Sequence, residues 1–399
     1  MATAALDLLL GPEGPNVLAA AVAEYDCQLE DLRPAEVNVD PSGAAIVTYV
    51  ADVRRADTTV TTEFLGATTG KRIPEGAAVV AGEYHGEPVE VGIWAWPHDP
   101  ALPALPTAST PTQLAELFRE FGLSESATLD IRPLRYLPSR HAVLEVHDGR
   151  SRWFVKVVRP SAVEDLLRRH EIAGRRVPVP PVLASTADGV IVLEEAQGTP
   201  LDTLIADDNA ALPSPEALES VLNALPDELT TLDREPSHLE LVEYHAGALR
   251  CAATDEPAVL ARLSELVDAL QSVDVEREEL VPVHGDFHEG QLFADNGVVT
   301  SLLDIDSAGP GERSDEWATL LAHLSALALD DPDRDAATRY ADAILAHAER
   351  HLPARTLRQR TAAALVGLAT GPFRLQHPQW PRHTVTLLDV AMHWLADTK

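Results

Sequence analysis

The sequence predicts an α+β protein with a small β-rich lobe and a large helical lobe, preceded by a β-rich domain. Two observations support this fold class: β-type runs bounded by turn residues recur up to about residue 195, and beyond Gly198 the apolar residues follow a helical period. The third is one hairpin-like pattern inside the helical half, with Asp295-Asn296-Gly297 as its turn. We expect an N-terminal cap domain at 1–125, a small lobe at 126–197 and a helical lobe at 198–399.

The N-terminal domain begins with a pattern that predicts a short amphipathic helix over residues 1–24. Its strands are expected at 44–52, 58–65, 76–83 and 88–95. The proline-rich segment at 97–112 predicts a loop or an interdomain linker. A helix is expected to follow at about 111–122.

The two lobes differ in their periodicity. In the small lobe a helix is expected at 160–174, and strands are expected at 129–136, 140–147, 152–158, 181–185 and 189–195. In the large lobe the first three helices are expected at 214–232, 237–252 and 256–273. A strand at 281–283 and the hairpin interrupt the helices, and four more helical stretches follow.

The charge excludes several kinds of partner. The 399 residues carry 63 acidic and 31 basic side chains, a formal charge of −32, which argues against binding to nucleic acid or to an anionic membrane surface. No run of roughly 18 apolar residues predicts a membrane span, and the N-terminus does not resemble a signal peptide. The two cysteines, Cys27 and Cys251, lie far apart, which predicts a cytoplasmic protein without a disulfide framework.

Lysine is rare in this chain. The three lysines are Lys71, Lys156 and Lys399, so nearly all positive charge is arginine, as a compositional bias toward Arg, Ala and Pro would produce. Lys156 nevertheless stands inside the apolar strand-like run WFVKVV. Either it is an edge-strand lysine that limits aggregation, or it has a chemical role.

The hairpin region carries the strongest chemical pattern. Asp286 follows a buried strand, the amide of Gln291 comes five residues later, and Asp304 follows the intervening hairpin. This order is that of kinase-type phosphoryl transfer, in which one carboxylate orients a hydroxyl and the amide and second carboxylate hold Mg²⁺. Asp306 either supports a metal ion or caps the segment that follows.

Lys156 fits the same machinery. In the kinase arrangement a strand lysine contacts the α- and β-phosphates and is held by a glutamate of the next helix. Glu164 and Glu171 lie seven residues apart on that helix and share a face, so either is a candidate partner, and we favour Glu171.

The motifs HGDFHEGQ and LLDIDSAGPGERSDEWA resemble the signature of the aminoglycoside phosphotransferase and choline-kinase-like superfamily, whose fold is protein-kinase-like. The resemblance covers about residues 130–330 and implies ATP and Mg²⁺ as cofactors. It implies a structural role for Asp315 in SDEWA. The other roles that it implies are a catalytic base at Asp286, metal ligands at Gln291 and Asp304, a phosphate contact at Lys156, and adenine contacts by the backbone of Glu194 and Ala196.

The sequence departs from the family pattern at two places. The metal-binding position usually holds Asn but here is Gln291, a variant similar to that of actinobacterial maltokinases and related sugar kinases. No glycine-rich phosphate loop is present, and Arg140 in the corresponding segment is a candidate phosphate contact instead. Relatives of this kind commonly carry an N-terminal cap domain, which residues 1–125 resemble.

The acceptor is expected to be a small molecule with a hydroxyl group. Acidic residues of the helical lobe favour an amino sugar or aminoglycoside, and a neutral sugar such as maltose is the alternative. A nucleotide-binding regulatory pseudokinase and a pure interaction protein remain as other function classes. Candidate acceptor-binding residues are Asp207, Asp208, Glu240, Glu243, Tyr244, Gln376, His377, Pro378, Gln379, Trp380 and Trp394.

Overall fold

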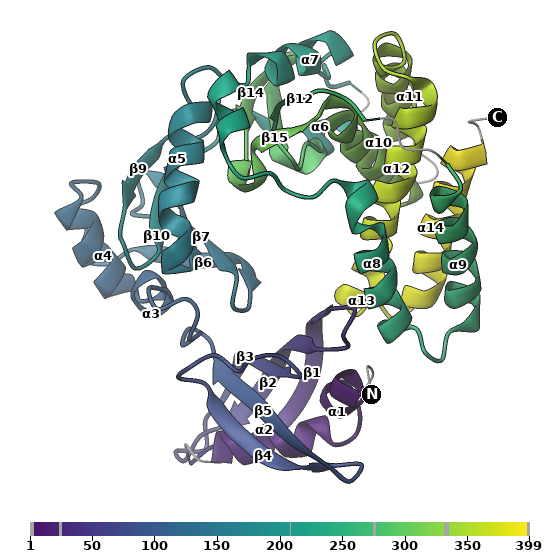
Figure 1. Ribbon diagram of the computed structural model, residues 1–399. Helices are drawn as coiled ribbons and strands as arrows, with labels where there is room; N and C mark the ends of the chain where they lie inside the picture. The colour runs from purple at the N-terminus through teal and green to yellow at the C-terminus, as the bar shows by residue number, and fades with distance from the viewer. Residues whose placement is uncertain (1–3, 24–25, 208, 274–276, 331–334, 397–399) are drawn as a thin grey trace.

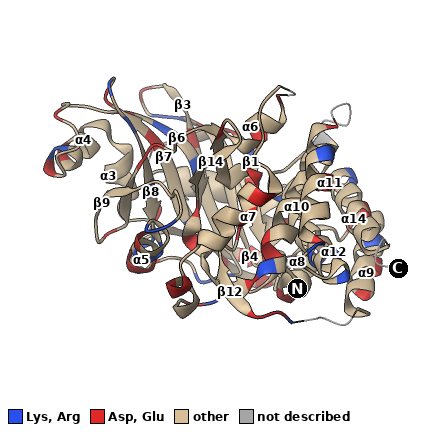
Figure 2. Ribbon diagram, turned by 90° about the horizontal axis from the view of Figure 1, so that it is seen from above, with Lys and Arg blue, Asp and Glu red and all other residues tan. Residues whose placement is uncertain are grey.

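The computed structural model describes residues 4–23, 26–207, 209–273, 277–330 and 335–396. Three parts follow one another along the chain: an N-terminal domain, a small lobe and a helical lobe (Figure 1). Acidic segments are present in each part, in keeping with the charge of −32 (Figure 2). Among the described residues, no helix is both long and apolar enough to cross a membrane.

The N-terminal domain is a five-stranded antiparallel sheet packed against two helices. Its helices are α1 (Ala4–Leu10) and α2 (Gly14–Ala23), and the strand order is β1-β2-β3-β5-β4. The strand bounds are β1 Gln28–Val39, β2 Ala45–Arg54, β3 Val60–Thr69, β4 Ala78–Tyr84 and β5 Glu87–Ala95. Leu9 and Leu18 of the helices share one buried cluster with Val47 and Tyr49 of β2.

Two features of this domain differ from the prediction. The expected single helix is divided at Gly11, where a Cβ would lie 2.1 Å from the carbonyl oxygen of Asp7; residues 1–3 and 24 lie outside the described part. Strand β1 was not predicted, because its charged residues and Pro34 break the two-residue alternation. A proline is tolerated there because β1 is an edge strand with an irregular register between Pro34 and Glu36.

The proline-rich segment is not a free linker. It contains α3 (Leu105–Ser109), and α4 (Pro111–Glu120) follows directly. Leu105 and Phe118 are fully buried in the same core cluster as Val155 of the small-lobe sheet. The loop prediction for 97–112 is therefore wrong over α3, because the apolar residues between the prolines are buried. These helices pack with the small lobe, and the domain boundary at residue 125 stays a prediction.

The small lobe is a five-stranded antiparallel sheet with helices on both faces. The strand order is β6-β7-β8-β10-β9, with bounds β6 Asp130–Leu137, β7 His141–His147, β8 Arg152–Val158, β9 Val182–Ser185 and β10 Val190–Glu194. Val155 and Val157 of β8 face α3 and α4. The opposite face, with Val158 and Ile191, packs against α5 (Val163–Ala173), which follows the short 3-10 helix η1 (Pro160–Ala162). Lys156 lies on this second face.

The helical lobe contains one embedded hairpin and two small sheets. Its first helices are α6 (Leu201–Ile205), α7 (Pro215–Ala224), η2 (Asp227–Thr231), α8 (His238–Ala252) and α9 (Pro257–Gln271). The sheets are β11-β13-β14 and β12-β15, with bounds β11 Thr199–Pro200, β12 Leu280–Val283, β13 Leu292–Asp295, β14 Val298–Leu302 and β15 Gly309–Glu312. The 3-10 helices η3 (Glu289–Gln291) and η4 (Ile305–Ser307) adjoin this hairpin.

The hairpin turn is as predicted, with left-handed φ angles of 49° at Asn296 and 79° at Gly297. The helix expected at 214–232 ends at Ala224, since Pro226 follows and the chain continues as η2. Five helices rather than four complete the described chain: α10 (Arg313–Asp330), α11 (Ala336–Ala348), α12 (Ala354–Leu368), α13 (Gly371–Arg374) and α14 (Trp380–Ala396).

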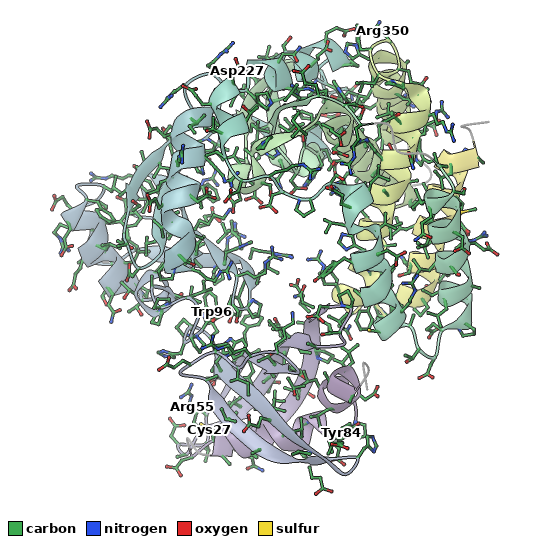
Figure 3. All side chains as sticks on the ribbon, in the orientation of Figure 1. Cys27, Arg55, Tyr84, Trp96, Asp227 and Arg350 are labelled. Atoms are coloured by element: carbon green, nitrogen blue, oxygen red, sulfur yellow. The ribbon has the colours of Figure 1, made fainter. Side chains whose placement is uncertain are left out.

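The N-terminal domain contacts both lobes. Toward the small lobe, Trp94 donates a hydrogen bond to the hydroxyl of Tyr136 (3.0 Å), and the ring of Trp96 lies 4.8 Å from that of Tyr136, at the junction seen in Figure 3. Toward the helical lobe, the β1–β2 turn packs on α8, where a Cβ on Gly247 would lie 2.7 Å from Pro41 Cβ. The three parts therefore lie around a common junction (Figure 1).

A fully buried arginine crosslinks the helical lobe. Arg360 of α12 pairs with Glu312 of β15 (2.7 Å) and with Asp315 of α10 (2.7 Å). Burial raises the pKa of Asp315 to about 6 even though Arg360 opposes this shift. Asp315 thus has a structural position, and the sequence had predicted that kind of role.

We expect the substitution Arg360→Met to lower the free energy of unfolding by roughly 3–5 kcal/mol, because it leaves two buried carboxylates without their cation. Arg355→Ala, at an exposed position of the same helix, is the matched control and is expected to change it by less than about 0.5 kcal/mol. Urea unfolding of both variants measures the difference. Equal effects would show that the buried ion pairs contribute nothing specific.

Candidate active site

The segment between β12 and β13 is held in an unusual backbone conformation. His284 is fully buried; its Nε2 donates to the carbonyl oxygen of Leu303 (2.7 Å) and its Nδ1 accepts from the N–H of Asp286 (3.3 Å). Gly285 has φ +84°, and a Cβ at this position would lie 2.6 Å from the carbonyl oxygen of Ser307. A glycine is therefore required next to Asp286.

Glu316 of α10 fixes the backbone of this segment. Its carboxylate accepts hydrogen bonds from the backbone N–H groups of His284 (2.7 Å) and Gly285 (2.9 Å). The side chain is 1% exposed, and burial raises its pKa although these donors oppose the shift. The sequence analysis singled out the neighbouring Asp315 and missed Glu316, whose only signal was its place in the same SDEWA motif.

Asp286 presents a partly exposed carboxylate, with 44% of its side chain accessible. Gln291 Nε2 lies 3.5 Å from Asp286 Oδ2, and His288 Nε2 lies 3.7 Å from the same oxygen. Burial alone would raise the pKa of Asp286, but His288, followed by His284 and His323, outweighs it and lowers the pKa to about 2. The carboxylate is therefore ionised at neutral pH, free to accept a hydrogen bond or a proton.

Lys156 lies between two aspartates. Its Nζ is 2.6 Å from Asp304 Oδ1 and 2.6 Å from Asp306 Oδ2, and 8% of its side chain is exposed. Burial would lower the pKa of Lys156, but the two carboxylates raise it, so the ammonium stays charged. Lys156 in turn keeps the pKa of Asp304 low against the effect of burial, whereas burial and the charge of Asp304 raise the pKa of Asp306.

The carboxylates beside Lys156 also fit a divalent cation. Asp306 Oδ1 is shielded from solvent and has no hydrogen-bond partner in the described part of the chain, as an unfilled ligand atom would be. The backbone N–H of Leu303 donates to the carbonyl oxygen of Gln291 (2.8 Å), which brings Gln291 next to Asp304. Asp304 has a left-handed φ of 53°. Carboxylate and amide oxygens are the donors that a hard cation such as Mg²⁺ takes.

The expected pair between Lys156 and Glu171 is not formed. Glu171 is 73% exposed and pairs with Arg175 at 2.9 Å, and Glu164 is exposed on the same face of α5. The rotation of α5 explains this result, because it directs Arg169 and His170 inward instead.

The inward residues of α5 connect this helix to the loop that carries the aspartates. Arg169 donates to the carbonyl oxygen of Ala308, which follows η4, and pairs with Asp165 at 2.8 Å. His170 is 9% exposed, and burial, assisted by the charge of Lys156, lowers its pKa to about 4. The pKa of His141 in β7 is also lowered to about 4, mainly by burial and then by the charge of Lys156. None of these three residues was predicted from the sequence, because only the fold brings His141 and His170 near Lys156 and Arg169 to Ala308.

The predicted adenine segment lies where β10 leaves the small lobe. Glu194 ends β10, and Ala196 lies in the short connection to the helical lobe. Two hydrogen bonds join this connection to β14. The N–H of Gln197 donates to Ser301 Oγ (2.8 Å), and the carbonyl oxygen of Gln197 accepts from Thr300 Oγ1 (2.6 Å). The adenine contacts themselves stay a prediction.

Several predicted acceptor residues are used for structure. Glu240 forms a capping box with Ser237 and pairs with Arg234 (2.8 Å), and Glu243 pairs with Arg250 (3.2 Å).

The aromatic and remaining candidates have other surroundings. Trp380 packs on Phe373 (5.1 Å) beside the core of the N-terminal domain, and Trp394 packs in the helical lobe. Asp207 accepts from the N–H of Asn209, Tyr244 is 46% exposed, and Asp208 lies outside the described residues. Residues 376–379 form the turn before α14.

A cavity of about 220 Å³ opens beside Asp286. It is lined by Val283, Gly285 and Asp286, by Thr319 of α10, by His238 at the start of α8 and by Glu235 in the loop before it. His238 Nε2 lies 2.9 Å from Thr319 Oγ1, and burial lowers the pKa of His238 to about 4. Glu235 is exposed and forms no ion pair within the described ranges, so its carboxylate adds negative charge to this cavity.

The depressed pKa of His170 makes stability depend on pH. Between pH 6.5 and pH 4 the unfolded chain binds a proton at this residue and the folded chain does not, so stability falls as the pH is lowered. We expect His170→Gln to reduce this fall by roughly 2–3 kcal/mol. Urea unfolding at both pH values tests it, with exposed His351→Gln as the control; equal falls in His170→Gln and the wild type would contradict the assignment.

The fold is similar to solved phosphotransferases. The chain matches a thermostable mutant of the aminoglycoside phosphotransferase APH(4)-Ia, in ternary complex with ADP and hygromycin B, at 15% identity and a TM-score of 0.50, with 70% of this chain and 97% of that chain covered. Macrolide 2'-phosphotransferase MphH from Brachybacterium faecium matches at 19% identity, with coverages of 69% and 97% and a TM-score of 0.40. Plasmodium vivax ethanolamine kinase matches at 10% identity, with coverages of 66% and 82% and a TM-score of 0.43.

The sequence comparisons give the family. No match to this chain was found among curated proteins. The predicted α+β, protein-kinase-like fold with a β-rich lobe and a helical lobe is confirmed. The model of the phosphotransferase enzyme family matches residues 138–354, more than half of the chain and including Lys156, Asp286 and Asp304. The protein therefore belongs to the phosphotransferase enzyme family, as the motifs had indicated.

Proposed function

We propose that this protein is an ATP- and Mg²⁺-dependent kinase that transfers the γ-phosphate to a hydroxyl of a small amino sugar or aminoglycoside. The observation that supports this most is the convergence of Lys156, Asp304, Asp306 and Asp286 from the small-lobe sheet and the hairpin of the helical lobe. These are the groups that phosphoryl transfer needs for positioning and for charge.

Asp286 acts as the base in this proposal. Its carboxylate is ionised, partly exposed and held by a rigid backbone that Glu316 and His284 fix. It accepts a hydrogen bond from the acceptor hydroxyl and takes the proton as the hydroxyl oxygen bonds to the γ-phosphorus, while the bond from that phosphorus to the bridging oxygen breaks and ADP leaves. A base with a pKa of about 2 contributes mainly by orientation, because it is a weak proton acceptor.

Lys156, Asp304 and Asp306 prepare the phosphate site. Asp304, Asp306 and Gln291 are the residues that would hold Mg²⁺, which supplies positive charge against the β- and γ-phosphate oxygens. Lys156 stays protonated and is positioned to bind the α- and β-phosphates. In the kinase proposal the two aspartates, rather than Glu171, keep Lys156 in place.

The acceptor site is the cavity beside Asp286. Its volume of about 220 Å³ suits a single sugar ring better than a large aminoglycoside. Glu235 and Asp286 give it negative charge, which favours an acceptor with an ammonium group. Glu240 and Glu243 give no support, since they pair with arginines. A neutral sugar such as maltose is the second candidate.

We expect Asp286→Asn to lower kcat for ADP release by about 10²–10⁴-fold while Mg–ADP binding is retained, because the amide cannot take the proton. Exposed Glu171→Gln is the control and is expected to keep wild-type kcat, since Glu171 pairs with Arg175 rather than Lys156. Wild-type turnover by Asp286→Asn would refute the assignment of Asp286 as the base. A wild-type protein that binds Mg–ATP but releases no ADP with any acceptor would instead be a pseudokinase.

The acceptor preference is tested with matched sugars. Glucosamine and glucose differ by one amino group, so ADP release with the two sugars, with maltose and with hygromycin B separates the candidates. We expect kcat/KM to be highest for glucosamine, and Glu235→Gln to lower it by about tenfold for glucosamine but not for glucose. Higher kcat/KM for maltose would favour the neutral-sugar alternative.

A further inference from the structure

A second cavity lies where the three parts of the molecule meet, and we call it the junction cavity. It has a volume of about 670 Å³ and is lined by β1, by the turn at Pro138–Arg140 between β6 and β7, by α8, and by the end of α12 with α13. It shares no lining residue with the cavity beside Asp286. Its apolar wall includes Val37 and Phe373.

The charge of this cavity is opposite to that of the chain. Its lining includes Lys71, Arg140 and Arg374, and none of the described lining residues is Asp or Glu. The whole chain has 63 acidic and 31 basic residues, so composition would not predict a cavity whose Lys, Arg, Asp and Glu lining residues are all basic. Lys71 comes from the N-terminal domain, Arg140 from the small lobe and Arg374 from the helical lobe.

The acids nearest to the cavity do not neutralise it. Lys71 pairs with Asp40 at 3.2 Å. Buried Glu36 accepts from Arg374 (3.2 Å) and from Arg135 of β6 (3.4 Å).

Arg140 has no ion-pair partner in the described ranges, so one of the three bases that line the cavity is not paired with a carboxylate. Burial lowers the pKa of Arg374, and Glu36 opposes this effect. The positive charges of Arg135 and Arg140 lower the pKa of Arg374 further, so the three guanidinium groups repel one another.

The β6–β7 turn carries Arg140. Ser139 has a left-handed φ of 61°, and its N–H donates to Asp99 (2.7 Å), which also accepts from the Tyr136 hydroxyl (2.9 Å). The carboxylate of Asp99 thus holds the turn that brings Arg140 to the cavity lining. An anion in the junction cavity would pair with Arg140.

We infer that the junction cavity is a binding site for a small polar molecule that carries a phosphate monoester. A phosphate monoester is close to dianionic at neutral pH, and guanidinium groups such as those of Arg140 and Arg374 bind its oxygens in pairs. The cavity volume leaves room for a carrier of monosaccharide size beside the phosphate. Because the lining comes from all three parts, the bound molecule would also join them.

Titration calorimetry of the full chain with glucose 6-phosphate and with inorganic phosphate tests this site, in saturating Mg–AMP-PNP to occupy the nucleotide site. We expect glucose 6-phosphate to bind the wild type more tightly than inorganic phosphate. Lys71→Ala and the isosteric Asn38→Asp, both at the cavity, are expected to weaken binding of both ligands by about tenfold or more.

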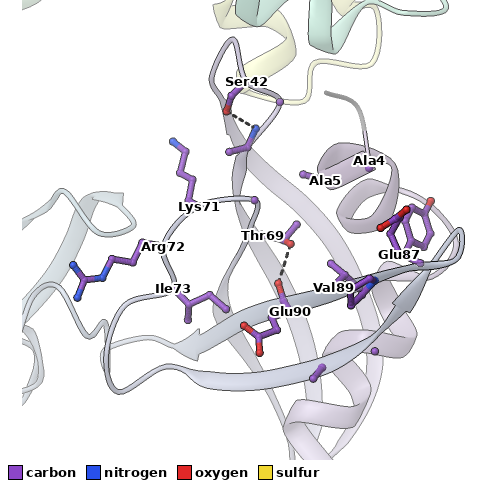
Figure 4. Close-up of a pocket in the computed structure, with 17 residues that line it drawn as sticks. Ala4, Ala5, Ser42, Thr69, Lys71, Arg72, Ile73, Glu87, Val89 and Glu90 are labelled. Atoms are coloured by element: carbon purple, nitrogen blue, oxygen red, sulfur yellow. Dashed lines mark hydrogen bonds between the residues drawn. The ribbon is translucent and has the colours of Figure 1, made fainter. Parts of the chain in front are cut away.

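Arg72→Ala is the matched control. All three substitutions lower the net charge by one unit, but Arg72 is exposed and outside the cavity lining, and Figure 4 shows it pointing away from the turn of Ser42 toward which Lys71 extends. We expect wild-type affinity for this variant. Unchanged urea midpoints in the three variants are required to show that each is folded.

Three results would overturn the inference: no binding of glucose 6-phosphate to the wild type, equal losses in Arg72→Ala and Lys71→Ala, or binding that is measured without Mg–AMP-PNP and is lost when Mg–AMP-PNP is present. The last would place the phosphate in the nucleotide site. Equal affinity for inorganic phosphate and glucose 6-phosphate would refute the sugar-sized carrier. The measurement needs no turnover, so its outcome is independent of the proposed kinase reaction.

Discussion

The contact of Lys156 with Asp304 and Asp306 is the interaction on which the arrangement of the two lobes depends. A nearly buried ammonium needs a compensating charge, and here two carboxylates 2.6 Å away supply it from a loop of the other lobe. The contact joins the small-lobe sheet to the hairpin of the helical lobe.

Neighbouring interactions reinforce this contact from both sides. Arg169 ties α5 to the backbone after Asp306, and Glu316 holds the backbone before Asp286 with two hydrogen bonds. Glu316 is a buried carboxylate that accepts from backbone N–H groups, and Arg169 is a buried guanidinium that contacts a backbone carbonyl and Asp165. The segment that carries Asp286 is therefore positioned by the core of the helical lobe, as the proposed reaction, which depends mainly on orientation, would require.

The N-terminal domain adds a third support to the two lobes. Buried Glu36 contacts an arginine from each lobe, and Tyr136 connects the same domain to the small-lobe sheet through Trp94. A carboxylate between two arginines offsets their repulsion, so removal of the domain would leave positive charge from both lobes facing across the junction. This domain is thus part of the electrostatics of the junction between the lobes.

Much of the fold was predictable because its signals are local. The strands β2 to β10, the hairpin turn at Asn296-Gly297 and the long helices follow from periodicity and turn residues over short windows. Strand β1 and helix α3 were not predictable in this way. Charged residues and Pro34 break the strand pattern of β1, which is an edge strand. The prolines around Leu105 are typical of a loop, but the helix there is stabilised by burial.

The sequence by itself determined which chemical groups stand at the hairpin, because strand ends and a short turn bring Asp286, Gln291 and Asp304 together locally. Tertiary structure alone decided that Lys156 pairs with Asp304 and Asp306 rather than with Glu171, since the rotation of α5 is set by packing against the sheet. Tertiary structure also decided that a chain with twice as many acids as bases forms a cavity with three basic and no acidic lining residues. Lys71, Arg140 and Arg374 line one cavity only when all three parts are assembled.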